Sequence, residues 1–297
     1  MIKKVVIPAA GLGTRLFPAT KEQPKEMLPI FCRLLNGDIG VKPLLHMVFE
    51  QLYDVGIREF CFVVGRGKRS IEDHFTPDLD CVVMMENRGK TNQASDLRTF
   101  YDKIETSTLM WVNQPEPRGL GDSVRIAQPF VQNESCVVHA GDTYILSENA
   151  QHLTHLIREH ERMNAHASFI VREVPDARQY GVIEGERIGE WTYAVKSAVE
   201  KPRNPISNLA ITAIYCFDPI VFKALKETEV GVHGELQLTD AIQKLVDWDL
   251  RVCAVRINSQ NTWLDIGSPE TYWDALLHSY DGFYTPRKPQ AHVALQR

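Results

Sequence analysis

The first half of the chain alternates short apolar runs with segments of helical periodicity. Residues 5–7 are apolar and β-branched, residues 44–55 carry apolar side chains at helical spacing up to Gly56, and residues 60–64 are apolar again. A glycine commonly ends a helix, and the two apolar runs are typical of buried strands. A strand, a helix and a strand in this order form a right-handed crossover between parallel strands, so the pattern predicts an α/β fold.

The same alternation continues as far as residue 139. It predicts strands at residues 81–85, 109–112 and 135–139, and helices at residues 94–104 and 123–130. We therefore expect a doubly wound, mostly parallel, Rossmann-like sheet, which binds its ligands at the carboxyl ends of the strands.

The second half mixes helical and strand patterns without a low-complexity linker. It predicts strands at residues 168–171, 193–200 and 211–217, and helices at residues 149–163, 218–225 and 268–279. Asp218-Pro219 and Ser268-Pro269 are typical helix starts. We expect one domain over residues 1–284, in which halves of about 1–145 and 146–284 share a cleft. Residues 285–297 contain two prolines and indicate a loose tail.

The composition excludes several classes of protein. The 297 residues include 33 Lys and Arg against 38 Asp and Glu, and the net charge of −5 argues against nucleic acid as a partner. No apolar run is long enough to cross a bilayer and no signal peptide precedes the first strand, so we expect no membrane association and a cytoplasmic location. The six cysteines form no CxxC pair, which favours buried free thiols.

The first predicted strand runs into a glycine-containing loop, IPAAGLGTR at residues 7–15. Without side chains at Gly11 and Gly13, backbone amides can approach a phosphate closely, and Arg15 and Lys25 can reach the same anion. The third glycine of a dinucleotide fingerprint is missing, because Leu16 stands there, and the Walker pattern is absent. The loop alone is equally compatible with a phosphate cradle and with a plain strand-to-helix turn.

Three further candidates carry polar side chains at the ends of apolar runs. Gln114 could pair with the imide edge of uracil or thymine while Gly119 lets the backbone approach the ring; a surface loop is the alternative. Asp142 and Asp265 each lie near a glycine and could hold Mg²⁺ together with nucleotide phosphates; the alternative is that they cap turns.

The second half offers candidates for a sugar phosphate. Glu200 could accept hydrogen bonds from sugar hydroxyls and Lys201 could hold a monophosphate, although a surface Glu-Lys pair is the alternative reading. Because neighbouring residues in a strand point to opposite faces, both reach one site only if the chain turns before Pro202. Tyr180-Gly181 and Gly234-Glu235 are further candidate segments.

The stretch at residues 7–15, together with PKEMLP at residues 24–29, resembles the signature of the sugar-nucleotide pyrophosphorylases, and most resembles their UTP–glucose-1-phosphate uridylyltransferase branch. The resemblance extends from Ile7 to about Ala275. It implies Mg²⁺-dependent nucleotidyl transfer from UTP to glucose 1-phosphate, giving UDP-glucose and pyrophosphate, by a protein that forms a homo-oligomer. The partners it implies are a nucleoside triphosphate, UTP or dTTP, and a hexose 1-phosphate.

The resemblance also implies roles for individual residues. It places the catalytic groups at Arg15, Lys25, Asp142 and Lys201, and the metal ligands at Asp142 and Asp265. The nucleotide-binding residues would be Ala10, Gly11, Gly13, Thr14, Arg15, Lys25, Gln114, Gly119 and Asp142. The sugar-phosphate-binding residues would be Tyr180, Gly181, Glu200, Lys201 and Thr212.

The chain departs from the family pattern at two positions and at one segment. Thr143 stands where uridylyltransferases of this type often carry a second acidic residue, and Ala213 stands where the family usually has a glycine against the sugar. Residues 31–41 look like an insertion of no assigned function. A thymidylyltransferase, or an enzyme with relaxed base or sugar choice, is therefore the closest alternative.

Two other classes fit the sequence less well. A nicotinamide oxidoreductase would need the glycine missing at Leu16 and an acidic residue after the second strand, where Gly65-Arg66 stands. A catalytically silent subunit would be expected to lose groups such as Lys25 or Asp142, which this chain retains.

Two polar segments are expected to face solvent. Residues 66–69 (Arg-Gly-Lys-Arg) are predicted to be a solvated loop. His152, His155 and His160 are predicted to lie on the solvent-facing side of a polar helix.

Overall fold

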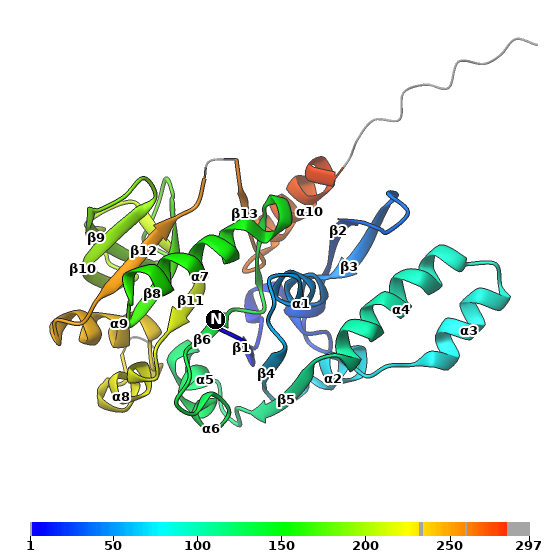
Figure 1. The fold of residues 1–297 in the computed structure, drawn as a ribbon, viewed down its shortest axis with the longest axis horizontal. Coiled ribbons are helices and arrows are strands. Elements are labelled where there is room, and N and C mark those ends of the chain that lie inside the picture. The colour runs from blue at the N-terminus through cyan, green and yellow to red at the C-terminus, as the bar shows by residue number, and fades with distance from the viewer. Residues whose placement is uncertain (1, 232–233, 259, 284–297) are drawn as a thin grey trace, which may run out of the picture.

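A nine-stranded sheet runs through the described part of the computed structural model, which covers residues 2–231, 234–258 and 260–283 (Figure 1). The predicted tail at residues 285–297 lies outside the described residues. The strand order across the sheet is β5 (Thr108–Asn113), β4 (Glu59–Val64), β1 (Lys4–Ala9), β6 (Cys136–His139), β11 (Leu209–Phe217), β8 (Ala167–Glu173), β12 (Val252–Arg256), β10 (Thr192–Glu200) and β9 (Gly181–Arg187).

The sheet is mixed, so the prediction of a mostly parallel sheet is wrong for the second half. Strands β5, β4, β1 and β6 pair in parallel, as the strand and helix alternation predicted. Strand β11 is antiparallel to both β6 and β8, and β10 is antiparallel to both β9 and β12. A parallel pair needs a crossover of a dozen or more residues, and the turn at residues 188–191 between β9 and β10 is too short for one.

Helices cover both faces of the sheet and create two apolar cores. Because side chains alternate along a strand, Val5 and Ile7 of β1 enter one core and Val6 enters the other. The first core includes side chains of α1 (Leu44–Asp54), α4 (Thr91–Glu105), α7 (Gln151–Met163) and α10 (Pro269–Phe283). The second core includes side chains of α5 (Leu120–Ile126), α6 (Gln128–Val131), α8 (Ile220–Glu227) and α9 (Leu238–Asp247).

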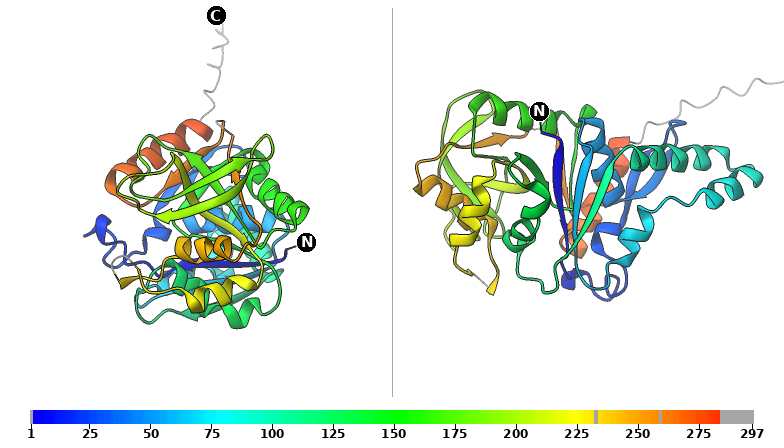
Figure 2. Two further views of the ribbon diagram at one scale, coloured as in Figure 1. Left: turned by 90° about the vertical axis from the view of Figure 1, so that its left-hand side faces the viewer. Right: turned by 60° about the horizontal axis from the view of Figure 1, so that its bottom comes forward.

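Shorter elements complete the fold around this framework. They are η1 (Thr14–Leu16), η2 (Lys25–Met27), α2 (Arg69–His74), α3 (Leu79–Asn87), η3 (Glu148–Ala150) and the two-stranded pairs β2 (Pro29–Arg33) with β3 (Ile39–Pro43) and β7 (Thr143–Leu146) with β13 (Thr262–Asp265). Helices α3 and α4 project from the end of the molecule opposite β9 and β10 (Figure 2). None of the helices among the described residues combines the length and apolar character needed to span a bilayer.

Most predicted elements of the first half are confirmed, but the strand at residues 81–85 is wrong. This segment lies in α3, where the Asp78 carboxylate accepts a hydrogen bond from the Cys81 backbone N–H (2.9 Å) and caps the helix start. Val82 is buried against the rest of the core. A short apolar run fits a buried strand and a helix equally well, and here the cap selects the helix. The cysteines are free thiols, and all except the half-buried Cys81 are buried.

Residues 31–41 form most of the β2–β3 hairpin, which packs against α10. The Tyr272 hydroxyl donates to the Pro29 carbonyl (3.0 Å), and the Phe31 backbone N–H donates to Ser279 Oγ (3.2 Å). Phe31 and Tyr280 make an edge-to-face ring contact with centroids 5.1 Å apart. The segment therefore holds the C-terminal helix against the first half of the chain.

Lys68 is buried, which corrects the prediction that residues 66–69 are a solvated loop. Its Nζ lies 2.8 Å from Glu26 Oε2, and the two residues are 8% and 1% exposed. Burial raises the pKa of Glu26, and the ammonium groups of Lys68 and Lys25 oppose that rise. The sequence places these partners 42 residues apart, so their pairing depends on the tertiary fold.

Two of the three α7 histidines are buried, against the prediction that all three face solvent. His152 Nδ1 lies 2.6 Å from Ser147 Oγ, and His160 Nδ1 lies 3.0 Å from Ser168 Oγ of β8. His155 is half-buried. The polar side of α7 is covered because neighbouring segments supply hydroxyl partners for these imidazoles.

We expect His152 to make the protein less stable at mildly acidic pH. Burial, and secondarily His139, lowers the pKa of His152 to about 3, so the unfolded chain takes up a proton that the folded chain excludes. Stability is then lost as pH falls below about 6.5, and the linkage gives about 2 kcal/mol between pH 7 and pH 5. Urea unfolding at pH 7 and at pH 5 measures how much stability each protein loses on acidification. We expect the His152→Gln variant to lose about 2 kcal/mol less than the unsubstituted protein. Equal losses in the two proteins would contradict the prediction.

Candidate active site

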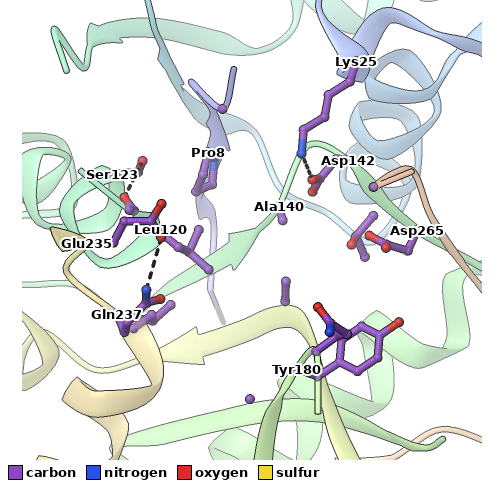
Figure 3. A pocket seen from close by; sticks show the side chains of 18 of the residues that line it. Pro8, Lys25, Leu120, Ser123, Ala140, Asp142, Tyr180, Glu235, Gln237 and Asp265 are labelled. Carbon is purple, nitrogen blue, oxygen red and sulfur yellow. Dashed lines mark hydrogen bonds and ion pairs between the residues drawn. The ribbon is translucent and has the colours of Figure 1, made fainter. Parts of the chain in front are cut away.

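The predicted site residues, with the exception of Thr212, meet in one cleft of about 850 Å³ (Figure 3). On one side lie Lys25, Asp142, Asp265 and Tyr180, and on the other lie Leu120, Ser123, Glu235 and Gln237. Of the predicted residues, the cleft is lined by Ala10, Gly11, Gly13, Thr14, Arg15, Lys25, Gln114, Gly119, Asp142, Tyr180, Gly181, Glu200, Lys201 and Asp265. The cleft lies at the carboxyl ends of β1 and β6, where the fold rule for open α/β sheets predicts it.

The loop after β1 forms the part of the cleft next to Lys25. Gly13 has a left-handed backbone (φ +63°) and precedes η1, and its carbonyl accepts a hydrogen bond from Thr20 Oγ1 (2.7 Å). A glycine is favoured there because other residues are strained in this conformation. A methyl group on Gly11 would lie 3.6 Å from Lys25 Cε, so the loop backbone is close to this lysine.

Lys25 and Asp142 form an ion pair between Nζ and Oδ2 inside the cleft. Burial alone would lower the pKa of the Lys25 ammonium, but Asp142, Glu26 and Asp265 raise it above its usual value. Burial also tends to raise the pKa of Asp142, and Lys25 nevertheless holds it below its usual value. The pair is therefore charged at neutral pH and presents a cation beside a carboxylate.

Asp142 and Asp265 are brought together by the β7–β13 pairing. Asp265 stands opposite Thr143 across the two strands, and the Ile266 N–H donates to the Asp142 carbonyl (3.0 Å). Burial, and then the neighbouring Asp142 carboxylate, raises the pKa of Asp265 to about 6. Two carboxylates that repel each other in a buried site favour a bound cation.

The donor set for a metal ion consists of two side chains. Within residues 2–231, 234–258 and 260–283, no cluster of three or more His, Cys, Asp or Glu side chains is arranged to hold a metal. Mg²⁺ keeps waters and takes phosphate oxygens as ligands, so two carboxylates fit a cation that arrives with a nucleotide better than a closed structural site.

Gln114 lines the cleft and is only 4% exposed. Gly119 follows it with φ +97°, and a Cβ at this position would lie 2.8 Å from both the Leu236 carbonyl oxygen and Glu235 Cβ. Leu236 also donates from its N–H to the Arg118 carbonyl (2.8 Å) and accepts from the Gly121 N–H (2.9 Å). The close approach of this second-half segment is therefore a reason for glycine at position 119.

Glu200 and Lys201 both face the cleft, although they are adjacent in sequence. Glu200 ends β10, and Lys201 has a left-handed backbone (φ +42°), which breaks the alternation of the strand. Glu200 Oε2 accepts a hydrogen bond from Thr239 Oγ1 (2.6 Å), and Lys201 Nζ lies 3.4 Å from Glu200 Oε1. The chain therefore turns before Pro202, as it must for Glu200 and Lys201 to reach one site.

Thr212 does not line the cleft, which corrects its prediction as a sugar-binding residue. It is completely buried, and its Oγ1 donates to the Ile170 carbonyl of β8 (3.3 Å). The neighbouring Ala213 lines the cleft instead, with φ +59° at an irregular point of the β11–β8 pairing. A left-handed residue in a strand is a position that favours glycine, so Ala213 is strained there.

Several cleft residues were not predicted from the sequence. They include Tyr215, Gln237, Thr239, Trp263 and Thr271. Thr239 and Gln237 closely follow the Gly234-Glu235 segment that the sequence singled out, so an extension of that segment would have found them. Trp263 lies two residues before Asp265 on β13, where strand alternation puts both side chains on one face.

The fold and this site define a nucleotide-transferring enzyme, and residues 4–281 match the nucleotidyl transferase family. The chain belongs to this family. It is 35% identical to the UTP–glucose-1-phosphate uridylyltransferase of Pseudomonas aeruginosa over 97% of this chain and 99% of that protein. It is 41% identical to the protein of the same name from Streptococcus pneumoniae serotype 4 over 82% of this chain and 80% of that protein.

Solved structures of the same kind superpose on the chain. A UDP-glucose pyrophosphorylase complexed with UDP-glucose is 31% identical, with a TM-score of 0.82 over 95% of this chain and 99% of that chain. A UTP-bound UGPase from Acinetobacter baumannii is also 31% identical, with a TM-score of 0.80 over 94% of this chain and 93% of that chain. The resemblance drawn from the sequence is confirmed.

Proposed function

We propose that this protein is a UTP–glucose-1-phosphate uridylyltransferase, which joins UTP and glucose 1-phosphate to give UDP-glucose and pyrophosphate. A phosphate oxygen of the sugar phosphate attacks the α-phosphorus of UTP, the bond to the β-phosphate bridging oxygen breaks, and pyrophosphate leaves with that oxygen. The observation that carries the proposal is the meeting of Lys25, Asp142 and Asp265 from three distant segments in one cleft.

The protein's part in such a reaction is positioning and charge neutralisation. A phosphate is already a nucleophile, so no activated serine or cysteine is needed. Lys25 would bind oxygens of the transferred and leaving phosphates, and the exposed Arg15 would steady the pyrophosphate as it leaves. The backbone of residues 10–14 would approach the triphosphate.

A divalent cation, which we propose to be Mg²⁺, fits the two carboxylates. Asp142 and Asp265 would hold it together with phosphate oxygens, and when bound it neutralises the negative charge that develops on the transferred and leaving phosphates. The elevated pKa of Asp265 is consistent with this assignment, because it comes from burial and, secondarily, from the neighbouring Asp142 carboxylate, and a bound cation would relieve both effects.

Cleft residues from the second half of the chain would hold the sugar phosphate. Lys201 would bind the attacking phosphate and aim it at the α-phosphorus, while Glu200, oriented by Thr239, would accept hydrogen bonds from sugar hydroxyls. Tyr180 and Gly181 would form the neighbouring wall of the sugar site.

The alternative is a thymidylyltransferase, or an enzyme that accepts both UTP and dTTP. Gln114 does not distinguish uracil from thymine, because the 5-methyl group is distant from the imide edge. The chain's identity to proteins named uridylyltransferases favours UTP.

Pyrophosphate release tests the proposal directly. The protein would be incubated with Mg²⁺ and each nucleoside triphosphate, against the 1-phosphates of glucose, galactose, mannose and N-acetylglucosamine. We expect the highest kcat/KM for UTP with glucose 1-phosphate, and no release when EDTA replaces Mg²⁺. Equal rates with dTTP would support the alternative, and no release with any pair would refute nucleotidyl transfer.

A further inference from the structure

The carboxamide of Gln114 is held in one orientation by a set of buried hydrogen bonds. Its Nε2 donates to Asp122 Oδ2 (2.9 Å) and to the Gly119 carbonyl (3.3 Å). Its Oε1 accepts from Ser123 Oγ (2.8 Å). A side-chain amide has two donor protons on nitrogen and two acceptor positions on oxygen. Both donor protons are therefore used within the protein, and among the residues that the structure describes one acceptor position on Oε1 is left unused.

The Gly119 carbonyl and the Asp122 carboxylate both favour this orientation, because neither group can donate a hydrogen bond, and the shorter and charged contact is the one with Asp122. The side chain is 7% exposed and forms an ion pair with Arg125, whose Nη2 and Nε (3.2 Å) both donate to Asp122 Oδ1. If the Gln114 amide turned over, its Oε1 would face Asp122 Oδ2, and two buried oxygens would be left in contact without a proton between them.

Asp122 contacts Gln114 but does not itself line the cleft. Gln114, Gly119 and Ser123 do line it. Arg125 lies on the same short helix three residues later, so the pair is formed within α5 and is present without a ligand. The orientation of the amide is therefore set before a nucleotide binds.

We propose that Asp122 is a positioning residue that makes Gln114 a hydrogen-bond acceptor toward the base and thereby selects UTP over CTP. This inference rests on the proposed function and on Gln114 facing the base. Uracil carries an N–H at position 3, which matches an acceptor; cytosine carries a bare nitrogen there, which would face the Gln114 oxygen without a proton. A site built for one hydrogen-bond pattern rejects the other because buried polar groups would be left unpaired.

Asp122→Asn tests the inference with a change of almost no volume. The new amide can accept from Gln114 Nε2 or donate to Gln114 Oε1, so the contact with residue 122 no longer disfavours the turned-over amide. We expect the ratio of kcat/KM for UTP to that for CTP to fall by about tenfold or more, through a loss with UTP and a gain with CTP. Asp122→Ala, which removes the acceptor, carries the same expectation and serves if the asparagine variant does not fold.

Ser123→Ala is the matched control, because it removes a hydrogen bond to the same amide but leaves Asp122 in place. We expect it to keep the UTP to CTP ratio within about threefold of the original. Thermal unfolding would identify the folded variants. An unchanged ratio in a folded Asp122 variant, or an equal fall in Ser123→Ala, would overturn the inference. Failure of the unsubstituted protein to use UTP would instead refute the proposed function.

Discussion

Asp142→Asn is expected to lower kcat/KM for UDP-glucose formation by about 10³-fold while the protein stays folded. The substitution keeps the shape of the side chain but removes the charge that pairs with Lys25 and that would hold the cation with Asp265. The transferred and leaving phosphates would then lose the cation that neutralises the negative charge developing on them. Pyrophosphate release measures the effect, and circular dichroism and thermal unfolding report the fold.

Asp176→Asn provides the control for this prediction. Asp176 is exposed, pairs with Arg178 at 2.6 Å and does not line the cleft, so the same chemical change there should leave kcat/KM unaltered. Lys25→Ala should be as damaging to turnover as Asp142→Asn, because it removes the cation from the same pair. Near-normal turnover in either cleft variant would show that the roles assigned to the pair are wrong.

Lys68→Met is expected to reduce the free energy of unfolding by about 3–5 kcal/mol. The substitution leaves Glu26, which is 1% exposed, without its 2.8 Å partner while the apolar stem of the side chain is largely kept. The cost is large because a buried carboxylate must then stay charged without its hydrogen-bonded ammonium or take up a proton. Urea unfolding of the two proteins measures the difference.

Arg69→Met is the matched control, one residue along the chain. Arg69 is exposed and its Nε lies 3.8 Å from Asp73, a surface pair that contributes under about 0.5 kcal/mol. If the two methionine variants lost the same stability, the Lys68–Glu26 pair would not have the importance that its burial indicates.

The sequence specified those features whose cause is local. The apolar run at residues 5–7 and the glycines that follow it predict a strand that ends in a loop, and in the structure Gly13 of this loop has a left-handed backbone. Helix α1 follows from apolar spacing and Gly56, and the parallel half of the sheet follows from the repeated crossover pattern. The resemblance added the residues of the cleft, and with the exception of Thr212 the structure brings them together.

Predictions from local patterns were wrong for Thr212 and for residues 81–85. Thr212 was predicted to face a sugar, but the irregular point at Ala213 directs its hydroxyl to Ile170 and leaves Ala213 on the cleft wall. Residues 81–85 were predicted as a strand because they are a short apolar run, and a short run does not distinguish a buried strand from a helix. The Asp78 cap favours the helix.

What the tertiary structure decided is which distant groups become partners. The pairs Lys68 with Glu26 and Glu200 with Thr239 join segments about 40 residues apart, whose proximity no spacing rule predicts. The antiparallel pairing of β9 and β10 depends on the short turn between them. Composition and periodicity specify the face on which a side chain lies, whereas its partner is set by how the sheet and helices pack. For this protein the sequence determined which charged and polar side chains are available to the cleft, and the fold determined how each of them is paired and oriented.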